Sequence, residues 1–232
     1  MIQHRRRPDL DSHDLGWLKA RHHFMVDPKG NPAHQSLGAL VVWNDDEIAP
    51  GTGFPMHGHR DLEIISYIRE GTVTHRDDVG GEGRIAAGDV QVISAGYGIR
   101  HEESNREATP LKLYQIWIES KYIGAVPRWQ SKPFPRTHHV GQLVTLASGL
   151  KGDESALPIR ADARVMGATL KAGETVSHSL TTSSQVYLVA ARGSLRVNAE
   201  AVDAGDGVAI ADMSQVIIEA TTDAEVVMVE LQ

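Results

Sequence analysis

Residues 86–93 read Ala-Ala-Gly-Asp-Val-Gln-Val-Ile. A Gly-Asp turn is followed by apolar, mostly β-branched residues around one polar residue, which is typical of a short strand. Residues 204–210 read Ala-Gly-Asp-Gly-Val-Ala-Ile and repeat this turn-and-strand unit. The chain therefore carries two similar β units, and the fold is predicted from what surrounds them.

Other apolar stretches are equally short and rich in β-branched or aromatic residues, as at residues 64–68, 113–118, 186–189 and 226–229. Glycine, proline, aspartate or asparagine bounds each of them, and the chain contains 22 glycines. Amphipathic helical spacing is not sustained beyond about two turns. Many short strands separated by turn signals predict an all-β sandwich or barrel.

The repeat also predicts the domain organisation. Gly71 recurs as Gly193, 122 residues later, each at the start of a similar turn. A proline-rich stretch at residues 131–135 separates the two copies. We therefore predict one β domain over residues 1–132 and a second over residues 133–232.

Composition excludes several classes of chemistry. The 232 residues include no cysteine, which rules out disulfide frameworks, cysteine-zinc sites, iron–sulfur clusters and thiol catalysis. The net charge of −7 argues against direct nucleic-acid binding. No apolar run approaches the roughly 20 residues of a membrane span, so no membrane association is expected. The absence of cysteine and of a secretory signal fits the cytoplasm.

Two histidine-containing motifs indicate a metal site. His57 and His59 are two residues apart, so on a strand their side chains point to the same face. His101 and Glu103 have the same spacing. Three imidazoles and one carboxylate with open positions suit Fe(II), Mn, Ni, Co, Cu or Zn. Iron is favoured because mixed histidine and carboxylate sites are typical of non-haem iron oxygen chemistry.

The repeat provides an internal control for this site. Offsets of 122 and 117 residues, taken from the repeated glycines, align the four candidate ligands in order with Ser179, Thr181, Ile218 and Ala220. All four ligands are thus absent from the second copy, while the turn glycines remain. This predicts a single metal site in the first half, with the second copy kept as scaffold.

These motifs resemble a known family. The residues that carry the resemblance are Asn44-Asp45-Asp46, Gly51-Thr52-Gly53-Phe54, His57-x-His59, Glu63-Ile64, Gly71-Thr72-Val73-x-His75-x-Asp77, Ser94-Ala95-Gly96-x-Gly98-Ile99-x-His101-x-Glu103 and Gln115-Ile116-Trp117. They are similar to the two motifs of the cupin superfamily and resemble most closely the pirin family, with its pirin-like quercetin 2,3-dioxygenases. The resemblance implies a bicupin fold of two tandem jelly-roll-like β-barrels. It also implies one metal, usually iron, held by the four candidate ligands.

The resemblance further implies an oxidoreductase activity: a metal-dependent dioxygenase that opens the ring of quercetin-like flavonols with O2 and releases carbon monoxide. Glu103, beside the metal, would accept the proton of the flavonol hydroxyl. The substrate cavity would be mostly apolar, with Phe54 and Met56 near its mouth.

A second hypothesis is an iron-bearing regulatory protein that binds a protein partner in a redox-dependent way. A change between Fe(II) and Fe(III) would alter the charge near the site, and the acidic chain would favour a basic partner. The roles of Glu63, His75, His22 and His23 stay open at this point: each fits either a structural position or a place near the pocket.

Overall fold

The computed structural model describes residues 1–133 and 142–232. The regular secondary structure of these residues consists of strands and one 3-10 turn, η1 (Arg7–Asp9), which confirms the all-β prediction. It divides into two compact units. We call residues 11–133 with 159–161 the N-terminal barrel, and residues 1–10, 142–158 and 162–232 the C-terminal barrel. Throughout the described ranges, no helix has the length and apolar character needed to cross a membrane.

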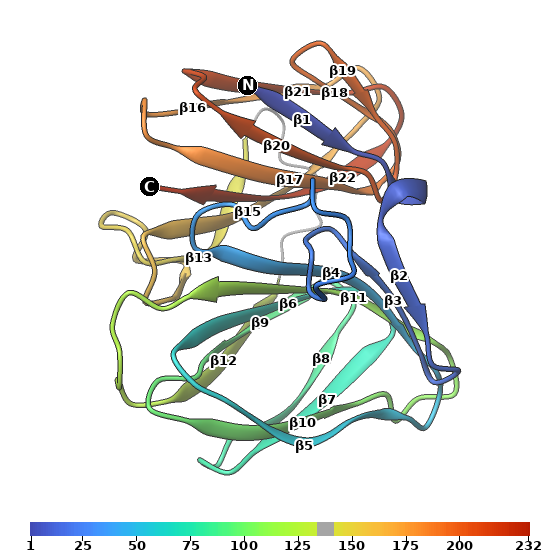
Figure 1. The fold of residues 1–232 in the computed structure, drawn as a ribbon, viewed down its shortest axis with the longest axis vertical. Helices are drawn as coiled ribbons and strands as arrows, with labels where there is room; N and C mark the ends of the chain where they lie inside the picture. Colours follow the sequence, from blue (N-terminus) through green and yellow to red (C-terminus); the bar gives the residue numbers. More distant parts are fainter. Residues whose placement is uncertain (134–141) are drawn as a thin grey trace. The chain divides into compact units, whose positions relative to one another are not determined.

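The N-terminal barrel consists of two facing antiparallel sheets (Figure 1). The larger sheet has the strand order β12-β9-β6-β11-β4-β3-β2, and the smaller has the order β5-β10-β7-β8. Its strands are β2 (Asp11–Asp14), β3 (Leu18–His22), β4 (Leu40–Ile48), β5 (Gly53–His59), β6 (Leu62–Glu70), β7 (Thr72–Asp77), β8 (Glu82–Ala86), β9 (Asp89–Ser94), β10 (Ile99–Ser104), β11 (Leu111–Glu119) and β12 (Arg128–Pro133).

The C-terminal barrel repeats this arrangement, except that the edge strand Leu157–Pro158 pairs parallel with its neighbour. Its larger sheet has the order β1-β20-β17-β22-β15-β13-β14, and its smaller sheet the order β16-β21-β18-β19. Its strands are β1 (Ile2–Arg5), β13 (Val144–Ser148), β14 (Leu157–Pro158), β15 (Ala163–Leu170), β16 (Thr175–Ser179), β17 (Gln185–Arg192), β18 (Leu195–Val197), β19 (Glu200–Val202), β20 (Gly207–Ala211), β21 (Gln215–Ala220) and β22 (Ala224–Leu231). The two tandem β-barrels of the predicted bicupin fold are therefore present.

The first ten residues belong to the C-terminal barrel rather than to the N-terminal one. Strand β1 pairs antiparallel with β20, at the position that β12 occupies beside β9 in the other barrel. Asp206 accepts hydrogen bonds from the Arg7 backbone N–H (2.7 Å) and from the His4 ring (2.9 Å). The predicted single boundary after residue 132 does not account for residues 1–10, which group with the C-terminal barrel. The end of the predicted boundary stretch falls within residues 134–141, outside the described residues.

The glycine that marks the repeat is required by the backbone in both barrels. Gly71 has φ +79° and Gly193 has φ +72°, a region that side-chain-bearing residues rarely adopt. A Cβ atom on Gly71 would lie 2.9 Å from the Pro110 carbonyl oxygen, and one on Gly193 would collide with the Asp223 carbonyl. The same tight turn is therefore built twice.

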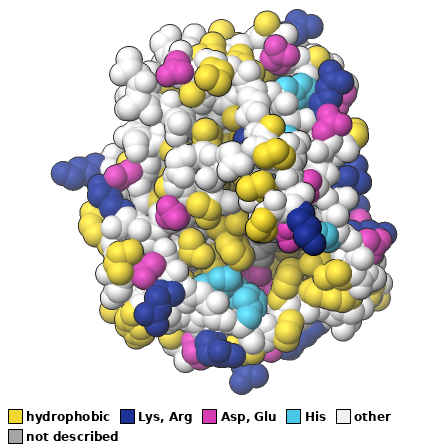
Figure 2. All heavy atoms as spheres, in the orientation of Figure 1, with side chains coloured by type: hydrophobic (Ala, Val, Ile, Leu, Met, Phe, Trp, Pro, Cys, Tyr) yellow, Lys and Arg dark blue, Asp and Glu magenta, His cyan; other side chains and the backbone are white. Residues whose placement is uncertain are grey.

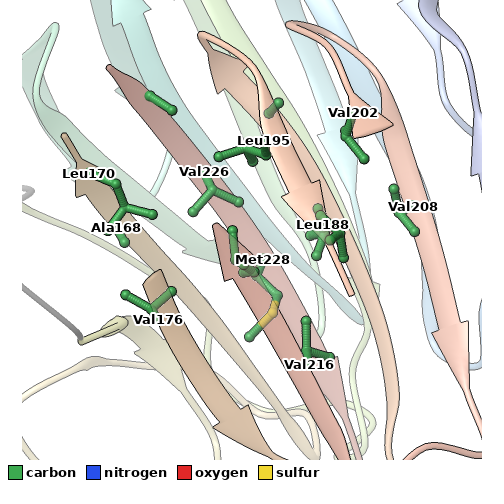
Figure 3. Close-up of a cluster of buried hydrophobic side chains, with 14 of the residues drawn as sticks. Ala168, Leu170, Val176, Leu188, Leu195, Val202, Val208, Val216, Val226 and Met228 are labelled. Atoms are coloured by element: carbon green, nitrogen blue, oxygen red, sulfur yellow. The ribbon is translucent and has the colours of Figure 1, made fainter. Parts of the chain in front are cut away.

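The two barrels bury apolar residues differently. The C-terminal barrel has one large core cluster of 18 buried residues, in which Leu188, Val226 and Met228 pack side by side (Figure 3). The buried apolar residues of the N-terminal barrel fall into smaller clusters, one around Ile68 and Leu113 and another around Ile64 and Ile93. Polar side chains take up interior positions of this barrel, and they form the candidate site.

Candidate metal centre

Three histidines converge inside the N-terminal barrel. His57 and His59 lie on β5, and β5 pairs with β10 so that His101 is directly opposite His57. The ring centroids are 4.8 Å apart for His57 and His59, 4.4 Å for His57 and His101, and 5.1 Å for His59 and His101. One ring nitrogen from each lies within 4.8 Å of the other two, so the three can bind one ion.

The hydrogen bonds around these rings leave their nitrogens available to a metal. His57 Nδ1 lies 2.8 Å from the Pro55 carbonyl oxygen, which can only accept, so Nδ1 carries the proton and Nε2 keeps its lone pair. His101 is 1% exposed, and neither of its ring nitrogens has a hydrogen-bond partner among the described residues. Buried polar atoms are almost always partnered, so the unpartnered lone pair of this ring fits a metal ligand. The donor set fits a divalent transition metal.

The electrostatics favour the metal-binding form of the rings. Burial, followed by the neighbouring imidazoles His57 and His75, lowers the pKa of His101 to about 3. Burial and the rings of His101 and His57 lower the pKa of His59 to about 4. Both rings are therefore neutral at pH 7, and a neutral imidazole is the form that coordinates a metal.

Glu103 is held by amide and hydroxyl donors. It is 2% exposed, and Gln115 Nε2 donates to its Oε2 at 2.6 Å. Its Oε1 accepts from Gln91 Nε2 and, at 3.4 Å, from Ser66 Oγ. The Gln91 amide is oriented in turn by Trp129, whose Nε1 donates to Gln91 Oε1 at 2.9 Å. These donors fix the position of the carboxyl group.

The structure brings together three of the four predicted ligands and places the fourth beside one of them. In the described part of the chain, Glu103 is not in the group of His57, His59 and His101, but forms a second group with His101 and His75 within 4.8 Å. His75 is fully buried, and its Nε2 lies 2.9 Å from Asp77 Oδ2. Its Nδ1 is buried without a hydrogen-bond partner among the described residues. His75 is thus a buried neighbour of the candidate ligands.

A cavity of about 240 Å³ opens onto the three histidines. Phe54, Ile64 and Trp117 form its apolar wall, and the Trp117 ring meets His59 edge-on at 4.9 Å. Asn44, Asp46 and Gln115 form a polar wall. Histidine side chains are seen beside hydrophobic ones at a hollow in the lower half of Figure 2. The surface of the cavity is mostly apolar, as expected, and Phe54 is part of its lining.

Other residues singled out by the sequence lie elsewhere. Within the described ranges, Met56 and Glu63 are not part of the cavity lining. Glu63 is fully buried and accepts hydrogen bonds from Ser94 Oγ (2.5 Å) and Ser120 Oγ (3.1 Å), which is a structural role. His22 and His23 are buried, at 6% and 0% exposure, and are not among the described residues that line this cavity.

Family models match both halves of the chain. Residues 3–118 match the model described as pirin, and residues 145–231 match the model described as quercetinase C-terminal cupin domain. The chain belongs to the pirin family. A pirin-like protein of Caulobacter vibrioides is 52% identical over 230 residues, covering 99% of each chain. The quercetin 2,3-dioxygenase of Escherichia coli K12 is 33% identical over 232 residues, covering 100% of this chain and 99% of that protein.

Solved pirin structures have the same fold. The crystal structure of YhhW from Escherichia coli superimposes with a TM-score of 0.94 at 33% identity, covering 100% of this chain and 98% of that one. A second structure of this bacterial pirin, in complex with nickel(II), has a TM-score of 0.92 at 33% identity, covering 100% and 99% of the two chains. The pirin family therefore binds a metal, and the bicupin fold predicted from the sequence is confirmed.

Strand pairing corrects the predicted correspondence between the two pirin barrels. Gly51 N–H donates to Asn105 O, and Gly173 N–H donates to Ala220 O, so Asn105 corresponds to Ala220 at an offset of 115. With the ladder registers, the four candidate ligands correspond in order to His178, Leu180, Val216 and Ile218, not to Ser179, Thr181, Ile218 and Ala220. An irregularity in the β5–β10 pairing, with an extra residue in β5, shifts the register. One imidazole, His178, is thus retained in the second barrel.

The polar residues around the ligands were not foreseen as part of the site. Gln91 and Gln115 lie in strands that otherwise read as apolar runs, whereas Asp46 lies in the polar run of residues 44–47 of β4. A single polar residue at an inward position of an apolar strand is the signal that could have identified the two glutamines.

Proposed function

We propose that this pirin is a metal-dependent dioxygenase that opens the ring of quercetin-like flavonols with O2. The observation that carries the proposal is the convergence of three neutral imidazoles on a cavity, with His101 buried and both its nitrogens free of hydrogen bonds from the described residues. The name of the Escherichia coli relative, quercetin 2,3-dioxygenase, supports this substrate class.

His57, His59, His101 and Glu103 would hold one divalent transition metal, with Fe(II) favoured by the donor set and Ni(II) supported by the relative's nickel complex. When bound, the metal supplies Lewis-acid polarisation of a substrate oxygen and access to O2 chemistry. The low pKa values of His59 and His101 keep both rings ready to coordinate at neutral pH.

The protein's own residues would bind and orient the flavonol. Phe54, Ile64 and Trp117 provide apolar surface for an aromatic ring, which also excludes water. Glu103 would accept the proton of the flavonol 3-hydroxyl, and Gln91 and Gln115 hold its carboxylate in place for this transfer. In the net reaction, one flavonol and one O2 yield one depside and one carbon monoxide, whose carbon comes from the opened ring.

The test is to load the metal-free protein separately with Fe, Mn, Ni, Co or Cu and to add quercetin under O2. We expect depside and carbon monoxide in equal amounts with at least one metal. Elemental analysis of protein purified without added metal identifies the resident ion. Absence of both products with every metal would overturn the assigned substrate class, and His101→Ala serves as the matched inactive control.

A further inference from the structure

The polar wall of the cavity contains a carboxyl group that the proposed reaction does not use. Asn44 and Asp46 are two residues apart on β4 and both line the cavity, with Gln115 from the neighbouring strand β11. Asp46 is 2% exposed, and its Oδ1 has no hydrogen-bond partner within the described residues. Gln115 donates its Nε2 to Glu103, and its Oε1 is likewise buried without a partner in the described chain.

Asp46 lacks the ion pair that its neighbour Asp45 makes among the described residues. The adjacent Asp45 accepts a hydrogen bond from Arg69 in an ion pair. Asp46 makes no such pair in the described structure, and burial, followed by the charges of Asp45 and Glu103, raises its pKa to about 8. An unpaired buried carboxyl group lowers the stability of the fold. Such a group at a cavity wall indicates a hydrogen-bond partner that arrives with a ligand.

The side-chain amide of Asn44 is oriented by hydrogen bonding so that it offers a donor beside the Asp46 carboxyl group. Its Oδ1 accepts from His22 Nδ1 at 2.8 Å, and His22 Nε2 lies 3.0 Å from His13 Nδ1. This chain of contacts fixes the amide so that Nδ2 is the donor left for the cavity. The wall therefore offers a donor at Asn44 and unpartnered oxygens at Asp46 and Gln115.

We propose that Asp46, flanked by Asn44 and Gln115, binds a second oxygen of a substrate whose first oxygen lies at the metal, so that the site selects rings with adjacent oxygens over monophenols. The inference rests on the proposed function for the position of the first oxygen. A cavity of about 240 Å³ lies below the roughly 300–1,000 Å³ of most ligand sites, so the enclosed part of the substrate is small. One dioxygenated ring fits this description, with the rest of a larger molecule extending through the mouth.

The test compares catechol with phenol on the nickel-loaded protein by titration calorimetry. Catechol carries the adjacent hydroxyl that phenol lacks. Wild-type protein is expected to bind catechol about tenfold more tightly than phenol, which corresponds to one hydrogen bond with a buried polar group. Asp46→Ala is expected to lose this preference while its affinity for phenol stays within about twofold, and Asp46→Asn should retain part of it. An unchanged preference in Asp46→Ala, or none in wild type, would overturn the inference.

Thermal stability separates recognition from a structural role. Removing an unpaired buried carboxyl group should raise the melting temperature of metal-free Asp46→Ala, whereas a structural role predicts a decrease. Asp45→Asn is the matched control: it breaks the ion pair with Arg69, so stability should fall while the catechol preference stays. Quercetin turnover is measured separately. A protein that shows the Asp46-dependent preference but no turnover would refute the proposed reaction and leave this inference standing.

Discussion

The interiors of the two barrels differ at equivalent positions, although their sheets have the same strand order. In the N-terminal barrel, Ser66, Gln91, Glu103 and Gln115 are buried and hydrogen-bonded to one another. Strand registers place Leu188, Val208, Ile218 and Met228 at the corresponding positions of the C-terminal barrel, all fully buried in its core. The fold therefore accepts either a continuous apolar core or a polar network around a site.

This difference shows that the fold does not need the polar network. The C-terminal barrel has a corresponding set of paired strands and is filled by apolar side chains (Figure 3). Burial of apolar surface stabilises a fold by roughly 25 cal/mol per Å². The N-terminal barrel buries polar side chains at these positions and so lacks part of this stabilisation. Polar residues inside a barrel that could have been apolar are best explained by function.

The largest expected effect comes from His101→Ala. Removing the most buried of the three imidazoles should reduce metal content to background, because two ligands are left from the histidine group. The metal-free variant should stay folded, because the C-terminal barrel folds with Val216 at this position. Elemental analysis and far-ultraviolet circular dichroism measure the two outcomes. Unfolding at room temperature would show instead that the metal is structural.

The second effect is that the change in unfolding free energy caused by His101→Ala in metal-free protein depends on pH. The pKa of His101 is lowered from its ordinary value of 6.5 to about 3 in the folded protein. Between pH 6.5 and pH 3, the unfolded chain therefore binds a proton at this ring and the folded chain does not. Wild-type stability therefore falls relative to His101→Ala as the pH decreases from 6.5 towards 3. The difference in unfolding free energy should change by on the order of 3 kcal/mol between pH 7 and pH 4.5.

Urea denaturation of both proteins at the two pH values measures this change. Asp46 contributes with the opposite sign, because burial raises its pKa to about 8, but it is present in both proteins and cancels in the difference. A difference that does not vary with pH would mean that the His101 ring titrates normally in the folded barrel.

Much of the fold and of the ligand set follows from local sequence. Short β-branched runs, repeated turn glycines and the two-residue spacing of histidines depend on neighbouring residues, so they can be read directly. The correspondence of His57 with His178 cannot be predicted from the sequence, because it depends on an irregular pairing between β5 and β10. The place of β1 beside β20 likewise depends on a contact between residues about 200 positions apart. The sequence shows Asp46 as one of four consecutive polar residues, but not that its Oδ1 lacks a partner among the described residues, because partners are set by tertiary packing.

The third effect exchanges one residue between the barrels. Met228→Gln places an amide in the apolar core of the C-terminal barrel, where Leu188 and Val226 offer it no hydrogen bonds from their side chains. We expect a loss of about 2 kcal/mol in unfolding free energy, measured by urea denaturation. The reciprocal Gln115→Met removes a donor to Glu103 and a buried oxygen without a described partner, so stability should change by less than about 1 kcal/mol.

The same reciprocal variant should weaken metal retention by about 10–100-fold, the usual effect of losing a residue that orients a ligand. Metal competition with a chelator measures it, with Met228→Gln as the control that keeps its metal. Equal stability losses in the two variants would show that the barrels tolerate polar residues alike.

The smallest effect concerns His178, the imidazole that corresponds to His57. His178 Nε2 lies 3.0 Å from Glu230 Oε2, and Glu230 also accepts from Ser184 Oγ (3.1 Å) and Arg164 Nη1 (3.3 Å). Burial raises the pKa of Glu230, but these partners, with His178 foremost, hold it below its ordinary value. His178→Ala leaves two partners in place, so we expect a loss of about 1 kcal/mol in unfolding free energy. Metal content should be unchanged, because the residues at the other three ligand positions of this barrel are Leu180, Val216 and Ile218. A fall in metal content would show that the retained imidazole still serves a metal, and the two barrels would then differ less than their interiors indicate.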